Sequence, residues 1–539
     1  MTASAELSSP WSWTLEGVEP PWESGRPSIY GHILAHLRPG EPGLAPGGED
    51  LPDQALVDEG QAVHWAPGAL DGIFGPPADP GESEETAWAV AAALRELTRK
   101  ATAERAAALY GLLVEASAIE YVDPLLSGLL EDERMPQDRL REVARWLATG
   151  APDREAVKIG IALLGLSRDA PQSDLLLVLG RHEELTLYAA VALGNATGEP
   201  AQLLWELARQ VTGWGRIQVV ERLGGTDDPD IAAWLLREGY RNRILIEYTA
   251  FTCARGGKLL AALTGGEPDD ALLLGAGEIL AALIRGREGP AEGIGEYGEG
   301  AAVAARYLKH LRRRPSLGLE HLLAVHTLRE FLEEAGNEAD DPELGWAPRR
   351  AALLRDAEDL LARPQWHQAV ADGLASRDGL AFARAAAAAR ALEMDVWDLA
   401  FERLRRGEDT WSLAVQTDDP ERMDRVVALV EERLELDRIA AGPQEELGFG
   451  ADFRDHAVLD TVLRELRRFP GHGWPLLRAA LQSPVVSNRN LAAAALASWG
   501  RAVWPPGADF LLRSALAHEP NAGTREVFTR VLAGASLEG

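Results

Sequence analysis

Cysteine, long apolar runs and positive charge are all scarce in this chain of 539 residues. A single cysteine, Cys253, excludes an internal disulfide, which is typical of a reducing compartment. No run approaches the ~18 consecutive apolar residues of a membrane-spanning helix, and no secretory signal is visible. The chain has 54 Lys and Arg residues and 84 Asp and Glu residues, so its net charge is -30, which repels nucleic acid. We therefore expect a cytoplasmic protein that binds neither membranes nor nucleic acid.

The motifs of common enzymes are also missing. The chain has neither a Gly-x-Ser-x-Gly elbow nor a Gly-x-x-x-x-Gly-Lys-Ser/Thr loop. Cys253 lacks the glycines that surround a haem-thiolate ligand. Segment 293–298 matches Gly-x-Gly-x-x-Gly, but no strand precedes it and Glu296 would repel a pyrophosphate. His32 and His36 lie one turn apart without the glutamate of a His-Glu-x-x-His zinc site. We expect no catalytic residue, no cofactor and no metal ion.

Residues 1–82 are predicted to form an irregular N-terminal segment, because Pro and Gly residues interrupt every possible long helix. One short helix is expected at about 28–37. Disordered segments are usually poor in aromatic residues, yet this one holds four tryptophans. We expect the segment to pack on the body of the protein through these side chains; a ligand-binding aromatic cage is the alternative. The tryptophans are Trp11, Trp13, Trp22 and Trp65.

The chain from Glu84 onward has the apolar period of amphipathic helices. Apolar residues recur every three or four positions, with Arg and Glu on the opposite face. Alternating strand patterns and hairpin turns are missing. The sequence therefore predicts an all-α fold. Helices are predicted at 84–100, 103–115, 137–149, 154–166, 200–211, 230–238 and 241–254.

Two of the helical segments repeat a spacing of small residues. Segments 185–194 and 488–497 both contain Ala-Ala-x-Ala-Leu, which is typical of the inner helix of a HEAT repeat. Small residues let neighbouring helices approach closely, and each helix pair then buries its apolar stripe against the next pair. The pattern predicts an α-solenoid of HEAT-like repeats. Asp-Pro turns at 226–229 and 417–420 predict capped helix starts.

Five further segments carry a resemblance to a known family: 66–72, 151–157, 213–216, 417–420 and 483–486. Through them the chain resembles bacterial HEAT-repeat proteins of unestablished function, some of which carry the label limonene hydroxylase. The resemblance implies a HEAT-type solenoid along most of the chain. Through the label alone, it also implies terpene oxidation.

Two glycine-rich stretches, 265–300 and 442–452, interrupt the predicted array as loops, bends or hinges. We therefore divide the chain near residue 300, with a minor break near 450. The predicted parts are the irregular segment 1–82, a first solenoid half at 83–300 and a second half at 301–539.

A cluster of Trp, Arg and Tyr marks the candidate partner-binding surface. These residue types dominate binding hot spots, and successive inner helices of a solenoid lie on one concave surface. The alternative is packing between repeats, with the arginines paired to Glu221 and Glu247. The candidate residues are Trp214, Arg216, Arg241, Arg243, Glu247 and Tyr248.

From these features we expect a non-catalytic intracellular scaffold that binds a protein or peptide partner, such as an acidic or amphipathic segment. One alternative is an enzyme or small-molecule binding protein with a site between repeats, including terpene oxidation. A second alternative is a HEAT-like nucleic-acid-binding protein. Its densest basic run would be 309–314, which the end of a helix also explains.

Overall fold

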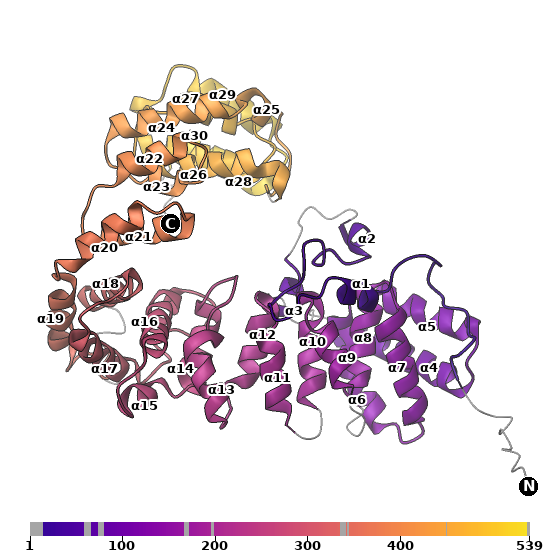
Figure 1. Cartoon of the computed structure of the whole chain (residues 1–539). Helices are drawn as coiled ribbons and strands as arrows, with labels where there is room; N and C mark the ends of the chain where they lie inside the picture. The colour runs from indigo at the N-terminus through magenta and orange to yellow at the C-terminus, as the bar shows by residue number, and fades with distance from the viewer. Residues whose placement is uncertain are drawn as a thin grey trace, which may run out of the picture. The chain divides into compact units, whose positions relative to one another are not determined.

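A computed structural model describes residues 14–58, 66–73, 80–166, 172–195, 199–334, 341, 344–448 and 450–535 (Figure 1). These residues form α-helices joined by turns, with short 3₁₀ and π-helical pieces and no strand. Outside the helices, the described backbone forms only two isolated β-bridges. The all-α prediction is confirmed.

Contacts within the chain divide it into two units, which we describe separately. The described residues up to Trp366 form the first unit, and those from His367 form the second. The boundary predicted near residue 300 falls where the packing of the first unit is continuous. The amide of Ile294 donates to the carbonyl of Leu283 at 2.9 Å, and Ile294 and Tyr297 are buried in the core of the first unit. The division by contacts falls instead at the start of α20 (Gln365–Leu374).

The helices of the first unit are α1 (Ile29–Ala35), α2 (Gln54–Asp58), α3 (Ala69–Ile73), α4 (Pro80–Arg99), α5 (Ala103–Glu115), α6 (Ala118–Glu131), α7 (Gln137–Gly150), α8 (Arg154–Leu164), α9 (Ser173–Leu179), α10 (Glu183–Gly194), α11 (Pro200–Ala208), α12 (Trp214–Leu223), α13 (Pro229–Trp234) with the π-helical turn Leu235–Gly239, α14 (Glu247–Gly256), α15 (Leu259–Thr264), α16 (Asp270–Arg285), α17 (Gly300–Arg313), α18 (Leu319–Glu333) and α19 (Arg350–Leu361). After α20, the second unit contains α21 (Gly379–Ala391), α22 (Trp397–Arg405), α23 (Trp411–Ala414), α24 (Pro420–Arg433), α25 (Leu436–Ile439), α26 (Arg454–Leu466), α27 (Trp474–Ala480), α28 (Val486–Trp499), α29 (Ala508–His518) and α30 (Ala522–Leu532).

Two helices begin at the Asp-Pro turns predicted from the sequence. The side chain of Asp228 accepts hydrogen bonds from two amides in the first turn of α13. Asp419 accepts one from the amide of Glu421 at the start of α24. A carboxylate at this position satisfies amides that the first helical turn leaves unpaired, and proline has no amide to satisfy. Both predicted starts are confirmed.

The helices stack in chain order within each unit. In the first unit, α8 packs on α10, α10 on α12 and α12 on α14, while α7, α9 and α11 form a second row, each packed on the helix that follows it. In the second unit, α26 packs on α28 and α28 on α30, with α27 and α29 placed in the same manner. Each pair thus buries its apolar stripe against the next. This order fits the predicted α-solenoid, whose assignment to HEAT-like repeats stays a prediction.

One buried polar position recurs in three successive helices of the stack. Thr186, Arg216 and Thr249 each stand eight positions before the glycine at the end of α10, α12 or α14. Each side chain donates to a carbonyl at the end of the preceding second-row helix, which ties the two rows together. The bonds run from Thr186 to Gly180 (2.8 Å), from Arg216 to Ala208 (2.7 Å) and from Thr249 to Tyr240 (2.5 Å).

The glycine-rich stretch 265–300 contains a helix, which corrects its interpretation as one loop or hinge. α16 occupies its first half, because apolar residues at helical spacing bury one face in the core. The stacking direction does change at this point. Gly224 and Gly256 place the ends of α12 and α14 side by side. By contrast, Arg285 at the end of α16 pairs with Glu247 at the start of α14 at 2.8 Å.

Gly275 tests the packing of α16, because a Cβ there would overlap the carbonyl oxygen of Leu236. We expect Gly275→Ala to lower the free energy of unfolding by about 1–3 kcal/mol, the usual effect of overpacking. Gly111 in α5 is the matched control, since no atom lies within 4 Å of a Cβ there. Gly111→Ala should raise stability by about 0.5–1 kcal/mol through helix propensity. Urea denaturation followed by circular dichroism measures both, and equal effects would contradict the close approach.

Candidate functional site

The described part of the N-terminal segment, residues 14–58 and 66–73, lies on the first unit, and we call it the strap. Its backbone binds the loops before α8 and α12: the amide of Ile29 donates to Ala151 at 3.1 Å, and that of Gly43 to Gln210 at 2.8 Å. α3, at its end, packs on α10 and α12. The strap therefore follows the edge at which α8, α10 and α12 begin (Figure 1). Its apolar side chains in the shared core are Leu15, Ile29, Ile33, Leu44 and Leu51.

One predicted tryptophan anchor lies in the strap. Trp22 packs against Tyr110 and Trp146, with ring centroids 5.2 and 4.7 Å apart. Its role as an anchor is thereby confirmed. Trp11, Trp13 and Trp65 lie outside the described residues.

Lys158 of α8 is the centre of a buried charge cluster beneath the strap. Its side chain is 2% exposed, and its ammonium lies 2.9 Å from Asp71 of the strap, 3.0 Å from Glu155 and 2.8 Å from Glu184. Burial alone would lower the pKa of Lys158, but the carboxylates, Glu184 first, raise that pKa well above its ordinary value. The lysine is therefore held charged, which excludes it as a nucleophile or general base.

Arg154, the first residue of α8, binds a second carboxylate of the strap. Its amide, Nε and Nη2 lie 2.7, 3.1 and 3.0 Å from the carboxylate oxygens of Asp53. Nη1 of Arg154 lies 4.0 Å from Glu184. Glu184 also accepts the amide of Gly68 in the strap at 2.8 Å. Two strap carboxylates and one strap amide thus meet buried charged groups where α8 and α10 begin.

A pocket of about 230 Å³ opens where the strap meets α10, α12 and the turn before α14, and we call it the anchor pocket. Pro67 of the strap, the ring of Trp214 and Ile244 are its large apolar walls. Arg243 and Glu49 are exposed beside it and lie 3.4 Å apart. The lining residues are Glu49, Ala66, Pro67, Glu183, Thr212, Gly213, Trp214, Arg243 and Ile244.

Glu183 holds the start of α12 in position beneath the pocket. Its carboxylate accepts the amides of Thr212, Gly213 and Gly215 at 2.9, 2.7 and 2.5 Å. A negative group is stabilised there by the free amides of the first helical turn. Glycine is needed at 215, because a Cβ would overlap the hydroxyl of Thr186. The glycines on both sides of Trp214 therefore allow the start of α12 to lie close against Glu183 and Thr186 of α10.

Three of the six predicted binding residues come together at the anchor pocket. Trp214 and Arg243 line it, and Tyr248 packs against Trp214 with ring centroids 5.2 Å apart. The side chain of Arg243 is 68% exposed. This part of the prediction has a structural counterpart, and partner binding there stays a prediction.

Arg216 does not belong to the surface, which corrects its place in the predicted site. Its Nη2 donates to the carbonyl of Glu238 at 2.9 Å, in addition to the bond to Ala208, and its guanidinium lies 4.8 Å from the ring centre of Trp234. Burial lowers the pKa of Arg216. The side chain is buried between helices, where a partner cannot reach it.

Arg241 and Glu247 are also engaged within the protein. Arg241 pairs with Glu278 of α16 at 2.9 Å, and Glu247 with Arg285 at 2.8 Å. Both pairs join α16 to the segment 241–247. Structural pairing, the alternative interpretation, therefore applies to Arg241, but its partner is Glu278 in place of the predicted Glu221 or Glu247.

The pocket residues absent from the predicted site come from the strap, from α10 and from the turns before α12 and α14. Pro67 and Glu49 are far from Trp214 in the sequence, and nothing in their spacing links them to it. The strap bond from Gly68 to Glu184 spans 116 positions. The sequence does contain one signal of this contact, namely the glycines on both sides of Trp214. Small residues beside a large ring indicate that another segment of the chain lies close by.

The cofactor motifs rejected from the sequence have structural explanations. Cys253 is buried in α14, and burial raises the pKa of its thiol. In the loop 293–298, the carboxylate of Glu296 accepts the amide of Gly293 at 2.8 Å, so the chain's own acid occupies a donor that a pyrophosphate would need.

The described histidines form no recognisable reactive group. The rings of His32 and His36 lie 4.4 Å apart, but the described residues contain no group of three His, Cys, Asp or Glu side chains able to hold a metal ion. Nδ1 of His456 lies 3.1 Å from Oγ of Ser483 and 2.7 Å from Asn488. A hydrolase needs the nucleophile and the orienting group on different ring nitrogens. Ser483 is fully buried and accepts the amide of Val485, which is a structural role.

Two arginines of the basic run 309–314 are paired within the first unit. Arg312 pairs with Asp356, and Arg314 lies 3.1 Å from Asp270 and 3.8 Å from Glu267. The two arginines are therefore balanced by carboxylates, which fits the helix-end interpretation of the run.

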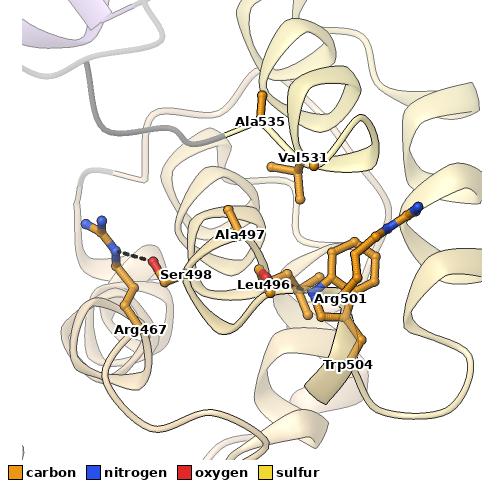
Figure 2. Close-up of a pocket in the computed structure, with 10 residues that line it drawn as sticks. Arg467, Leu496, Ala497, Ser498, Arg501, Trp504, Val531 and Ala535 are labelled. Atoms are coloured by element: carbon orange, nitrogen blue, oxygen red, sulfur yellow. Dashed lines mark hydrogen bonds between the residues drawn. The ribbon is translucent and has the colours of Figure 1, made fainter.

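A second pocket, of about 510 Å³, lies in the second unit between the ends of α28 and α30. Figure 2 shows Arg467 and Arg501 on opposite sides, with Leu496, Ala497 and Ser498 between them. Nε of Arg467 donates to Ser498 at 3.4 Å. Arg501 lies over the ring of Trp504 at 5.1 Å and pairs with Asp509. The guanidinium groups do not converge on one point, which weakens this pocket as an anion site.

No described helix is long and apolar enough to cross a membrane. No family model, curated protein or solved structure matches the chain. The resemblance to HEAT-repeat proteins, and the hydroxylase label attached to some of them, therefore remain predictions.

Proposed function

We propose that the protein is a non-catalytic cytoplasmic scaffold that binds a protein or peptide partner at the anchor pocket. The observation that carries the proposal is an apolar cavity beside exposed side chains of binding type. Trp214, Pro67 and Ile244 form the cavity walls, and Arg243, which also lines the cavity, is 68% exposed. Leu245, which follows the lining residue Ile244 in the sequence, is 55% exposed. Tryptophan, tyrosine and arginine are enriched among the residues that dominate binding at protein interfaces.

The size of the cavity favours a side chain over a cofactor. Small-molecule sites usually measure about 300–1,000 Å³, and the anchor pocket is smaller, at about 230 Å³. One apolar side chain of a partner fits this volume. Glu183 is already satisfied by three amides, and the exposed charged groups beside the pocket are Arg243 and Glu49, at 68% and 59%. Of these two, Arg243 is the one that can pair with a carboxylate of a partner. We therefore propose a partner segment with an apolar anchor residue next to a carboxylate.

Partner binding is tested by substituting exposed residues, because replacing buried Trp214 would also destabilise the protein. We expect Arg243→Glu combined with Leu245→Glu to reduce partner capture from the native host by more than about tenfold, since one carboxylate repels the partner and the other removes apolar contact. The matched control is Arg438→Glu with Leu130→Glu, which makes the same charge change at exposed positions elsewhere. Quantitative mass spectrometry of captured proteins measures both. Equal capture by the two variants would contradict the proposal.

The second candidate is small-molecule binding in the second unit. The pocket of about 510 Å³ lies within the usual range for such sites, and its lining contains two arginines, Ser498 and no carboxylate. The terpene oxidation implied by the resemblance has no reactive group at this pocket to support it. Nucleic-acid binding is opposed by the net charge of -30.

A further inference from the structure

The anchor pocket is built from two separate pieces of chain. Glu49, Ala66 and Pro67 of the strap form one side, and Thr212, Trp214 and Ile244 are among the residues of the helix stack on the other. Ala69 of the strap also packs against Trp214 and Ile217. If the strap left the helix edge, one wall of the pocket would leave with it.

Two carboxylates supply the buried charged contacts of the strap near the pocket, in addition to the apolar packing of Leu51 and Ala69. Asp53 binds Arg154 through three donors, and Asp71 lies 2.9 Å from the ammonium of Lys158. The helices that carry the strap here, α2 and α3, have five residues each, which is too short for independent stability. Their position therefore depends on what they contact.

The helix stack can release these carboxylates without leaving a buried cation alone. Arg154 and Lys158 are balanced by Glu155 and Glu184 of the stack itself, with Lys158 at 3.0 and 2.8 Å from them. Docking adds Asp53 and Asp71, so the cluster changes from two positive and two negative groups to two positive and four negative. Attraction to the cations is then opposed by repulsion among carboxylates and by their desolvation. These opposing terms reduce the net stabilisation that the two strap carboxylates add to docking.

We propose that docking of the strap gates the anchor pocket, with the contacts Asp53–Arg154 and Asp71–Lys158 as its latch. The inference rests on the proposed function, because the gate controls access of the same partner. With the strap docked, the pocket is complete and binds. With the strap released, the charges of the helix stack remain paired, and Trp214 loses the wall that forms its pocket.

The test uses a thiol as a reporter of docking. Leu51 is 3% exposed, lies two residues from Asp53 and contributes to the core. Leu51→Cys places a second thiol in a chain whose own cysteine is buried, so the modification rate by a water-soluble disulfide reagent reports the strap. We expect the added pair Asp53→Asn and Asp71→Asn to raise that rate by about tenfold or more. The matched control is Arg26→Gln, which removes the 2.7 Å ion pair between the strap and Asp153, remote in sequence from the pocket.

Two further readouts make the result decisive. Far-UV circular dichroism should show unchanged helix content, so that release of the strap is separated from unfolding. Partner capture should fall by about tenfold in the Asp53→Asn, Asp71→Asn variant and stay unchanged in Arg26→Gln. An unchanged thiol rate contradicts the latch, and a raised rate with full capture contradicts the gate. Failure of the proposed function shows separately, as full capture by the Arg243→Glu, Leu245→Glu variant.

Discussion

Replacing Lys158 by methionine is expected to lower the free energy of unfolding by about 3–5 kcal/mol, the usual effect of breaking a buried ion pair. Methionine fills much of the same space but carries no charge. Asp71, Glu155 and Glu184 would then face one another beneath the strap with Arg154 as the remaining cation. Urea denaturation followed by circular dichroism measures the loss.

The control for this prediction is Lys258→Met, which removes a lysine whose side chain is more than half exposed and lies 3.4 Å from Asp227. Exposed pairs contribute little, so the unfolding midpoint should barely move. Similar losses for the two variants would show that the buried cluster is not a special source of stability.

The pH dependence of the cluster follows from the two pKa shifts. Burial alone would raise the pKa of Glu184, but Lys158 lowers it below its ordinary value of 4.5. The stability from Glu184 is therefore present above 4.5 and is lost as the pH falls through the lowered pKa. The raised pKa of Lys158 means that its contribution is complete below 10.5 and is lost only at higher pH.

A comparably large effect is expected in the second unit from Arg489→Met, again about 3–5 kcal/mol. Arg489 and Glu519 are fully buried, and Nε and Nη2 of Arg489 donate to the Glu519 carboxylate at 2.7 and 2.6 Å. Nη1 donates to the carbonyls of Ser483 and Pro484 at 2.7 and 2.9 Å. Methionine leaves the carboxylate and both carbonyls without these donors, and thermal or urea unfolding measures the result.

A second substitution separates the buried charge from the space it fills. Adding Glu519→Leu to Arg489→Met removes the uncompensated carboxylate, so the double variant should recover a large part of the loss. Arg438→Met, at an exposed pair with Glu435, serves as the control and should leave stability unchanged. If the double variant is less stable than Arg489→Met alone, the loss comes from packing and the electrostatic explanation is wrong.

The helical fold could be predicted because its signals are local. Apolar spacing and the caps at Asp228 and Asp419 depend on residues within a few positions of each other. The predicted start of the helix at residue 241 is wrong, because α14 begins at Glu247 after a turn. Asn242 accepts the amide of Ile244 and donates to the carbonyl of Leu245, both at 2.9 Å, which forms a turn where a helix from 241 was predicted.

The candidate site could be predicted only in part, because its decisive contacts join distant segments. Trp214 and Arg243 carry the residue types of binding surfaces, and they do line the pocket. Residue type also made Arg216 a candidate, but its guanidinium donates hydrogen bonds to the backbone carbonyls of Ala208 and Glu238. The pairing of Asp53 with Arg154 spans 101 positions and leaves no spacing pattern in either segment.

The most direct test of the account is photochemical crosslinking in the native host. A benzophenone side chain at position 245, an exposed position next in the sequence to the lining residue Ile244, should crosslink a discrete partner protein when irradiated. The same group at position 130, exposed at 68% on α6, is the control and should not crosslink that partner. Mass spectrometry of the adduct should place an apolar residue next to an acidic one at the partner's crosslinked site. A partner that crosslinks from position 130 and not from 245 would contradict binding at the anchor pocket.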